Sequence, residues 1–450
     1  MNALGTLILA VLLFVVLFGS RRSALLGMMA GVMFLTQNSN IDIGGFNCFP
    51  TRFLELAGFI RVAARREFSF HQLNKIDRAL LLLYFYTTVV FLLRSTEGQA
   101  YQIGTTLDVF LCYFTFRGLL SDMEDFRWFL GAFVILLAPY ALLVLVESMT
   151  GHNPFAVIGG VDGGSAWMRN GRPRCFGSFR QPDTLGMFAA SFIPLFIGLA
   201  AATREPRRPL IGIGLCVIIV WAANSGGAAG AAATGLACWG FWLFRTEMRK
   251  VRWAIVGVII LLALVMKAPI WYIFAHISSI TGGDGWHRSY LLDVSFQHLG
   301  KWWLAGIPIT ETSGWFPYDL ATTGGADITN QFVAFGLTAG LGALALFLFL
   351  LTRTFSQLGG AMAVVRFNSQ RSDANEFLLW GLGVMLVVHV MDWFGITYFD
   401  QMNVVWYMQL AVISGLSQKF AATEPGSLKE SDEPRAEVDE TSQIPARSAV

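Results

Sequence analysis

Charged residues are scarce in this chain of 450 residues. Asp, Glu, Lys and Arg make up 14% of it, against about 25% in an average soluble protein, whereas hydrophobic residues make up 55%. The deficit is concentrated in runs without any charge, such as Leu7–Phe18, Phe129–Val146 and Leu341–Leu351. One soluble core has no room for so much Leu, Phe and Val, so the composition excludes a soluble globular domain.

Cysteine is also scarce, and its number is odd. Five cysteines argue against a disulfide framework. Cys112, Cys216 and Cys238 fall in apolar segments, where we expect them to pack as small hydrophobic residues. Cys48 and Cys175 fall in segments expected on one side of the membrane, which leaves a disulfide between them as a minor alternative. The first segment has no basic n-region and no small-residue cleavage site, so we expect no cleavable signal peptide.

Apolar segments of near-spanning length recur along almost the whole chain. Because helices satisfy their own backbone hydrogen bonds in lipid, we expect most of these segments to be helical. The sequence therefore predicts an all-α membrane protein with about 12–13 transmembrane helices. Two of the segments, 23–36 and 79–93, are short, so one of them is either re-entrant or has misplaced ends. The segments are 2–18, 23–36, 42–60, 79–93, 101–118, 127–147, 183–202, 208–223, 227–244, 252–267, 330–352, 375–394 and 402–417.

The basic residues predict the orientation of these segments. Most of the 32 Lys and Arg fall in every second connection, and the positive-inside rule makes that set cytoplasmic. The N-terminus is then outside and the C-terminus inside. The net charge of +2 gives no indication of nucleic-acid binding, because the basic residues lie in short loops. Nine basic residues break the rule: Arg52, Arg94, Arg169, Arg172, Arg174, Arg180, Lys267, Arg288 and Lys301.

Two long extracytoplasmic loops hold most of these nine residues, and they divide the chain. Long loops in a compact protein are usually functional. The last segment contains Pro, Ser and Glu with no apolar period, and we expect it to be disordered and cytoplasmic. The predicted regions are N-terminal transmembrane helices at 1–147, a first loop at 148–182, central helices at 183–267, a large loop at 268–329, C-terminal helices at 330–420 and a tail at 421–450.

The first loop predicts an anion site. Arg169, Arg172, Arg174 and Arg180 stand within twelve residues, just before a helix that opens at Pro182–Asp183. A helix N-terminus favours an anion, and the planar fork of arginine binds two phosphate oxygens at once. One interpretation is a diphosphate-binding site at the membrane boundary. The alternative is that these arginines pair with lipid headgroups or with nearby aspartates.

The second loop opens with a segment of helical character, residues 284–299. His287 and His298 share one stripe of this helix but lie about 16 Å apart, so they cannot act on one small group or form a metal pair. Arg288 lies about a quarter-turn from His287. The aromatic residues Trp286, Trp302 and Trp303 fit either a membrane-interface belt or stacking against a sugar. Asp327 stands at a helix start, as a cap or as a base.

Three stretches of these loops resemble the O-antigen ligase and O-antigen polymerase superfamily. The resemblance covers roughly 145–345, and it depends on the order and spacing of short motifs in the long loops. The stretches are Glu147 with Thr150-Gly-His-Asn153 and Arg174-Cys-Phe-Gly-Ser-Phe-Arg180; Gly285-Trp-His-Arg288 with Gly300-Lys-Trp-Trp-Leu-Ala-Gly306; and Thr329-Asn330-Gln-Phe-Val with Gly336.

The resemblance implies a polytopic glycosyltransferase of the bacterial inner membrane with a fold like that of class C transferases. Such enzymes take a glycan from an undecaprenyl diphosphate carrier on the outer face and join it to a glycan or lipid acceptor, in O-antigen or exopolysaccharide biosynthesis. It assigns the diphosphate to Arg174, Arg180 and Arg288, and it implies glycan contacts for Trp286, Trp302, Trp303 and Asn330.

Two departures from the family pattern favour a polymerase or an exopolysaccharide-type relative over a ligase. Thr329 stands where the ligases usually carry histidine before Asn330, and Gly226 stands where they tend to carry arginine after Ser225. The candidate bases are then Asp327, His287 and Asp284, in that order. The loops contain no Asp-x-Asp pair, so we expect no metal and no other cofactor. A glycan transporter or flippase, or a non-catalytic assembly protein, is the alternative.

Overall fold

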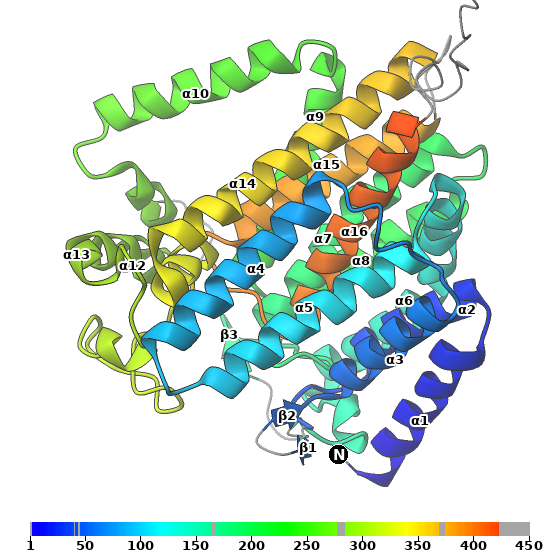
Figure 1. Cartoon of the computed structure of the whole chain (residues 1–450), viewed down its shortest axis with the longest axis horizontal. Helices are drawn as coiled ribbons and strands as arrows, with labels where there is room; N and C mark the ends of the chain where they lie inside the picture. Colours follow the sequence, from blue (N-terminus) through cyan, green and yellow to red (C-terminus); the bar gives the residue numbers. More distant parts are fainter. Residues whose placement is uncertain are drawn as a thin grey trace, which may run out of the picture.

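The protein is a bundle of helices with two short β-hairpins, as seen in a computed structural model (Figure 1). The structure describes residues 2–39, 41–43, 46–161, 163, 167–276, 284–368 and 374–422. Residues 423–450, which include nearly all of the tail predicted to be disordered, lie outside the described residues.

The first half of the chain contains nearly all of the predicted N-terminal and central segments as helices. Its elements are α1 (Ala3–Phe18), α2 (Arg21–Phe34), β1 (Ile41–Ile43), β2 (Phe46–Cys48), α3 (Pro50–Ala64), α4 (Lys75–Arg94), α5 (Gln99–Leu119), α6 (Met123–Thr150), η1 (Pro154–Val157), β3 (Trp167–Arg169), β4 (Arg172–Arg174), α7 (Pro182–Ala202) and α8 (Arg207–Ala223). Each pair of strands is antiparallel.

The second half continues the bundle and adds a smaller cluster at one end. Its elements are α9 (Gly226–Gly240), η2 (Phe241–Phe244), α10 (Met248–Val265), η3 (Ile270–Tyr272), α12 (Gly285–Gln297), α13 (Leu299–Trp302), η4 (Ile309–Thr312), α14 (Gln331–Asn368), α15 (Ala374–Asp392) and α16 (Gln401–Ala422). The helical character predicted for residues 284–299 is confirmed by α12.

Two of the predicted segments have different ends in the structure. The segment 42–60 is not one helix: β1 and β2 precede α3, which begins at Pro50 because proline suits the first helical position. The short segment 79–93 is a full helix of 20 residues. It begins earlier, at Lys75, because the side chains and backbones of Asn74 and Asp77 form a capping box.

Six described helices are long and apolar enough to cross a membrane, by length and composition. They are α4, α6, α7, α9 with η2, α14 and α15, and α10 makes a seventh when it is counted with the segment Ile270–His276, to which it is bent by 96°. The chain is therefore a multi-pass membrane protein. The helix α10 lies apart from the bundle, and none of its residues is buried (Figure 1).

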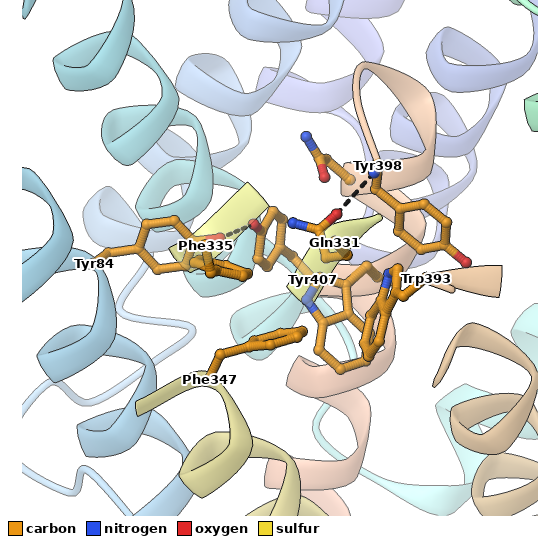
Figure 2. A pocket seen from close by; sticks show the side chains of 9 residues that line it. Tyr84, Gln331, Phe335, Phe347, Trp393, Tyr398 and Tyr407 are labelled. Carbon is orange, nitrogen blue, oxygen red and sulfur yellow. Dashed lines mark hydrogen bonds between the residues drawn. The ribbon is translucent and has the colours of Figure 1, made fainter. Parts of the chain in front are cut away.

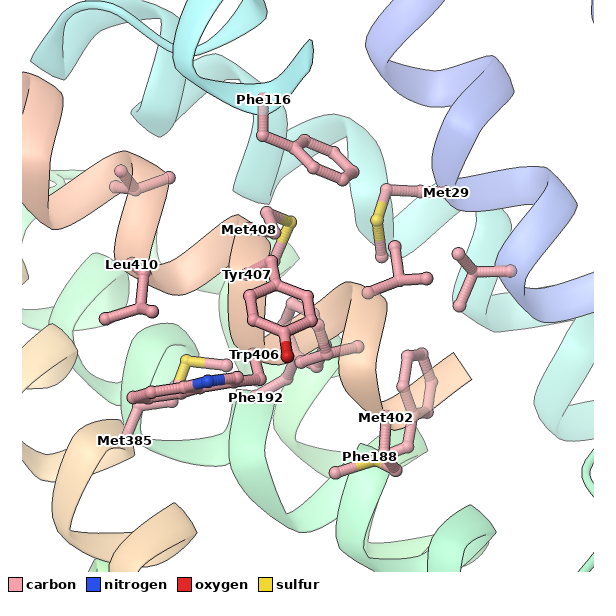
Figure 3. Packing of buried hydrophobic residues seen from close by; sticks show 14 of the residues in the cluster. Met29, Phe116, Phe188, Phe192, Met385, Met402, Trp406, Tyr407, Met408 and Leu410 are labelled. Carbon is pink, nitrogen blue, oxygen red and sulfur yellow. The ribbon is translucent and has the colours of Figure 1, made fainter. Parts of the chain in front are cut away.

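The helices α7 and α16 form the centre of the bundle. Both are buried on nearly all sides over most of their length, as expected of a helix surrounded by others. The helix α7 packs against α8, α9 and α15, and α16 packs against α5 and α14. Figure 3 shows this core, in which Phe188 and Phe192 of α7 lie near Met402 and Trp406 of α16. These two helices hold the adjoining loops in fixed positions.

One end of the bundle carries the two long loops, and we call it the loop end. There α2, α4, α6, α8 and α15 finish, and α3, α5, α7, α9, α14 and α16 begin. The cluster of α12 and α13 lies at this end (Figure 1). Its own small core contains Leu291, Trp302, Trp315 and Phe316.

A break inside α14 joins this cluster to the bundle. The helix is interrupted at Ala339 and Gly340, and Gly340 has a φ of 77°. The freed N–H of Leu341 donates to the carbonyl of Trp303 at 2.7 Å, and Ile307 N donates to the carbonyl of Leu337 at 2.9 Å. The second loop therefore supplies the partners that the interrupted helix lacks.

A glycine is required at this break, which makes its replacement testable. We expect Gly340→Ala to lower the stability of the protein by about 1–3 kcal/mol, because alanine is strained at this φ and its Cβ has no room beside the Leu304 carbonyl. The measurement is thermal unfolding in detergent. Gly359→Ala in the same helix is the control: its Cβ meets nothing within 4 Å, and we expect unchanged or higher stability.

Candidate functional site

The first loop is fixed by a carboxylate at the end of α6. The two oxygens of Glu147 accept hydrogen bonds from the backbone N–H groups of Phe176 and Gly177 at 2.8 and 2.9 Å. Asn153 donates through Nδ2 to the Gly177 carbonyl at 2.8 Å. These contacts join the two halves of the first stretch of the family resemblance, and they hold the segment from Arg174 to Arg180 on the bundle.

Arg174 lies at the start of two helices. Its Nη2 is 3.0 Å from Oδ1 of Asp183, in the first turn of α7. The same oxygen accepts a short hydrogen bond from the hydroxyl of Ser225, which is the N-cap of α9. The N-termini of α7 and α9 are therefore joined by one carboxylate, with an arginine beside it.

Arg288 occupies the space between α9 and the loop that follows α15. Its Nε donates to the carbonyl of Gly395 at 3.2 Å. A Cβ at Gly395 would be 3.1 Å from its guanidinium carbon, and a Cβ at Gly227 would be 3.7 Å from its Nη2. Glycine at these two positions therefore leaves room for the side chain. Gly227 is two residues beyond Ser225, so Arg288 and Arg174 both lie near the start of α9.

Arg180 immediately precedes α7 and faces a different group of residues. Its Nε is 2.7 Å from Oδ2 of Asp400, and its Nη2 is 3.4 Å from the carbonyl of Gln37. Its guanidinium carbon is 5.1 Å from the centre of the Phe49 ring. Asp400 is the last residue before α16.

The three predicted phosphate-binding arginines thus gather around the N-termini of α7, α9 and α16. Free N–H groups and the helix dipole favour an anion at each of these positions. Each guanidinium already contacts a carboxylate or a carbonyl, as a charge at the edge of an apolar bundle requires. The arrangement is able to hold a phosphorylated ligand that replaces those partners.

The three predicted bases also lie together. His287 is buried, with its ring stacked on Phe316 at 4.3 Å between centres, and its Nε2 is 3.1 Å from the carbonyl of Asp327. Asp284 caps α12 by accepting from the N–H of His287 at 3.2 Å. Burial raises the pKa of Asp327 above its usual value; the nearby His287 lowers it, and Asp284 adds to the rise. A carboxyl group with a raised pKa is suited to proton transfer.

The structure tests one of the two roles considered for Asp327, that of a helix cap. Asn330, not Asp327, caps α14, because its Oδ1 accepts from the N–H groups of Phe332 and Val333 at 3.0 and 3.1 Å. The Asp327 side chain is therefore not needed as the helix cap. The ring of His298 packs against the ring of Trp315, with 5.1 Å between the two ring centres.

The loop between α15 and α16 was not predicted to take part in the site, although it contacts Arg288, Arg180 and the segment next to Asp327. The carbonyl of Gly395 binds Arg288, and the carboxylate of Asp400 binds Arg180. Thr397 Oγ1 donates to the carbonyl of Ile328 at 2.6 Å, next to Asp327. The one available signal was an aspartate at the start of the last apolar segment, a position typical of a cap.

Two of the predicted glycan contacts need correction. Trp302 is buried in the α12–α13 cluster, where its Nε1 donates to the carbonyl of Ser295 at 2.9 Å and its ring lies against Gly336. Asn330 is buried as the cap of α14. Both side chains are structural. Trp286 and Trp303 are about half exposed, at 53% and 51%, and remain open to a ligand.

A small pocket lies beside this region, between α4, α14 and α16. Nine residues line it, none of them charged, and most are aromatic. Figure 2 shows Tyr84 hydrogen-bonded to Tyr407, and the N–H of Tyr398 donating to Oε1 of Gln331 at 2.8 Å. The hydrogen bond that Gln331 accepts from Tyr398 holds the loop after α15 in place, so the residues of the pocket support the site. The pocket has no charged residue in its lining and is therefore not suited to a diphosphate.

None of the five cysteines forms a disulfide. Cys48 and Cys175 are both free thiols, so the alternative of a disulfide between them is not realised. Burial raises the pKa of Cys175 to about 12, which keeps it protonated at neutral pH. Within the described ranges, no group of three or more His, Cys, Asp or Glu side chains is placed to hold a metal ion.

The different places of the tryptophans predict different effects of their removal. We expect Trp302→Ala to lower stability by about 3–5 kcal/mol, because it empties the core of the α12–α13 cluster. Trp286→Ala is expected to change stability by less than about 0.5 kcal/mol, because its indole lies on the surface against Tyr290. Thermal unfolding of both variants measures this, and equal losses would contradict the assignment.

Comparison with models of known protein families finds no match for this chain, and comparison with curated proteins finds none either.

Proposed function

We propose that the protein is a membrane glycosyltransferase that polymerises, or ligates, undecaprenyl-diphosphate-linked oligosaccharide units. The single observation that carries this proposal is the gathering of Arg174, Arg180 and Arg288 at helix N-termini, with Arg288 adjacent in the chain to His287 of the candidate base group. A cationic site next to a proton acceptor fits the transfer of a sugar from a diphosphate. The resemblance in the loops favours the same function.

We also propose the number of membrane-spanning helices and their orientation. About 12–13 helices cross a bacterial inner membrane, with the N-terminus and the loop end outside and the C-terminus in the cytoplasm. The fold is then similar to that of class C transferases. The alternation of basic residues between connections supports this orientation.

The reaction breaks the bond between the anomeric carbon of the donor glycan and its diphosphate oxygen. An acceptor hydroxyl forms the new glycosidic bond, and its proton passes to the carboxylate of Asp327 or to its neighbours His287 and Asp284. Negative charge grows on the departing lipid diphosphate, and Arg174, Arg180 and Arg288 stabilise that charge. Trp286 and Trp303 offer exposed aromatic faces to the sugars.

Replacing the arginines tests the role of the charge. We expect Arg288→Ala and Arg180→Ala to abolish glycan lengthening while protein levels in the membrane stay unchanged, because the leaving group loses its stabilising cation. Glycan length on gels is the measurement. Arg172→Ala is the control, since Arg172 is exposed in the same loop and stacks on Trp221 at 4.3 Å. Wild-type chain lengths from both test variants would overturn the assignment.

The pH dependence tests Asp327. A base acts only when deprotonated, so activity should fall as pH drops through the pKa of Asp327, which burial raises above the ordinary range. In Asp327→Asn we expect a low residual rate without this acidic limb. A pH–rate profile in liposomes measures both effects. An acidic limb that persists unchanged in the variant would assign the base elsewhere.

A transporter or flippase of lipid-linked glycans is the second candidate. It is favoured by one observation, the position of Asp108 about midway along α5, where it pairs with Arg52, because an ionisable residue within an apolar helix often marks a transport path. Purified protein in liposomes that contain lipid-diphosphate glycan alone separates the candidates. Elongated glycan indicates a polymerase, movement across the bilayer indicates a flippase, and neither result indicates an assembly role.

A further inference from the structure

Arg52 is one of the basic residues at the loop end for which the proposed reaction gives no role. It lies in the first turn of α3 and faces α5. Its Nε is 2.6 Å from Oδ1 of Asp108, and its Nη2 is 2.5 Å from Oδ2. This two-point geometry is the one in which arginine also binds a phosphate.

A second ion pair, between Arg180 and Asp400, lies beside the same aromatic ring as the pair of Arg52 and Asp108. The guanidinium carbon of Arg52 is 5.7 Å from the centre of the Phe49 ring, and that of Arg180 is 5.1 Å from the same centre. Arg180 is paired with Asp400 at 2.7 Å. Burial raises the pKa of Asp400 to about 6; Arg180 lowers it, and the Asp108 carboxylate adds to the rise. Two arginines and two carboxylates around Phe49 therefore form one electrostatic unit.

This unit is open to the surroundings of the bundle. The side chains of Asp108 and Arg180 are 30% and 34% exposed. Residues four apart lie on one face of a helix, so Leu56 and Ile60 continue the stripe of α3 that begins at Arg52. Both are about half exposed, at 46% and 51%. A cation at the head of an exposed apolar stripe matches a lipid with a phosphorylated head group.

We propose that Arg52, Phe49 and Arg180 form an entry site, next to the transfer site, for the phosphate groups of a lipid-linked diphosphate, whose tail lies along Leu56 and Ile60. Asp108 and Asp400 occupy the two guanidinium groups while the site is empty, and the incoming phosphates displace them. The choice of a lipid-linked diphosphate as the ligand rests on the proposed function, whereas the geometry of the site is independent of that function. Arg180 belongs to both sites, so the phosphates pass from Arg52 to the transfer site while Arg180 still holds them.

Arg52 and Asp108 have opposite expected effects on binding. The probe is undecaprenyl diphosphate, added to the full-length protein in phosphatidylcholine nanodiscs, and the measurement is the equilibrium dissociation constant. We expect Arg52→Gln to weaken binding about tenfold through the lost charge-assisted hydrogen bonds. Asp108→Asn is expected to strengthen binding several-fold, because a competing anion is removed. Unchanged binding in Arg52→Gln, or weaker binding in Asp108→Asn, would overturn the proposal.

Two further variants guard against misfolding and non-specific charge effects. Gly104→Ala keeps every charge but brings a Cβ to 3.1 Å from Nη2 of Arg52, and we expect binding weaker than in the wild type. Arg22→Ala is the matched control, since Arg22 is a half-exposed arginine at the opposite end of the bundle, paired with Glu124 at 3.3 Å. Its binding should equal that of the wild type, and a loss equal to that of Arg52→Gln would overturn the proposal.

A soluble probe separates a lipid site from a site for free phosphate. The double variant Leu56→Ser, Ile60→Ser should weaken binding of undecaprenyl diphosphate and leave binding of inorganic diphosphate unchanged. An equal effect on both probes, or none on the lipid, overturns the lipid assignment.

The experiments distinguish failure of the entry site from failure of the proposed function. If Arg52→Gln binds the lipid normally and Arg288→Ala no longer elongates glycan, only the entry site is rejected. If Arg52→Gln loses lipid binding but the wild-type protein never elongates glycan, only the transferase is rejected.

Discussion

An arginine at the end of an apolar helix bundle must have an anion or a carbonyl oxygen beside it, because an unpaired buried charge costs several kcal/mol. This requirement organises the loop end. Asp183, Asp400 and Asp108 lie beside Arg174, Arg180 and Arg52, and a backbone carbonyl lies beside Arg288. The carboxylates that pair with these arginines in the empty protein carry negative charge, as a phosphate does, so a phosphorylated ligand competes with them for the same guanidinium groups.

Contacts also join segments of the two long loops to each other and to the bundle. Glu147 binds the turn that leads to Arg180. The ring of Trp302, in the second stretch of the family resemblance, lies against Gly336, in the third. Each stretch is too short to fold alone, and each has its partner in another part of the chain. The tight contact at Gly336 and the break at Gly340 then fasten the second loop to the membrane helix that follows it.

The helices were largely predictable, because apolar runs in a membrane protein mark them directly. The polar elements were less so. The hairpin before α3 was hidden by apolar residues such as Ile41 and Phe46, which suit a strand as well as a helix. The structure brings Asp284, His287 and Asp327 together, which the sequence did not predict, and their role as bases stays a prediction. The burial of Trp302 and the capping role of Asn330 were not predictable, since they depend on contacts across the fold. The position of Asp400 beside Arg180 joins residues more than 200 positions apart.

The short connection between α15 and α16 sets the geometry of the site more directly than either long loop. One peptide segment carries the oxygen that receives Arg288 and, five residues later, the carboxylate that receives Arg180. The segment is tied at both ends, by the N–H of Gln331 to the carbonyl of Trp393 and by the N–H of Tyr398 to Oε1 of Gln331. The separation of the two guanidinium groups consequently depends on the number of residues between Gly395 and Asp400. A single residue added or deleted there changes the length of ligand that can bridge the two groups, although neither arginine is itself replaced.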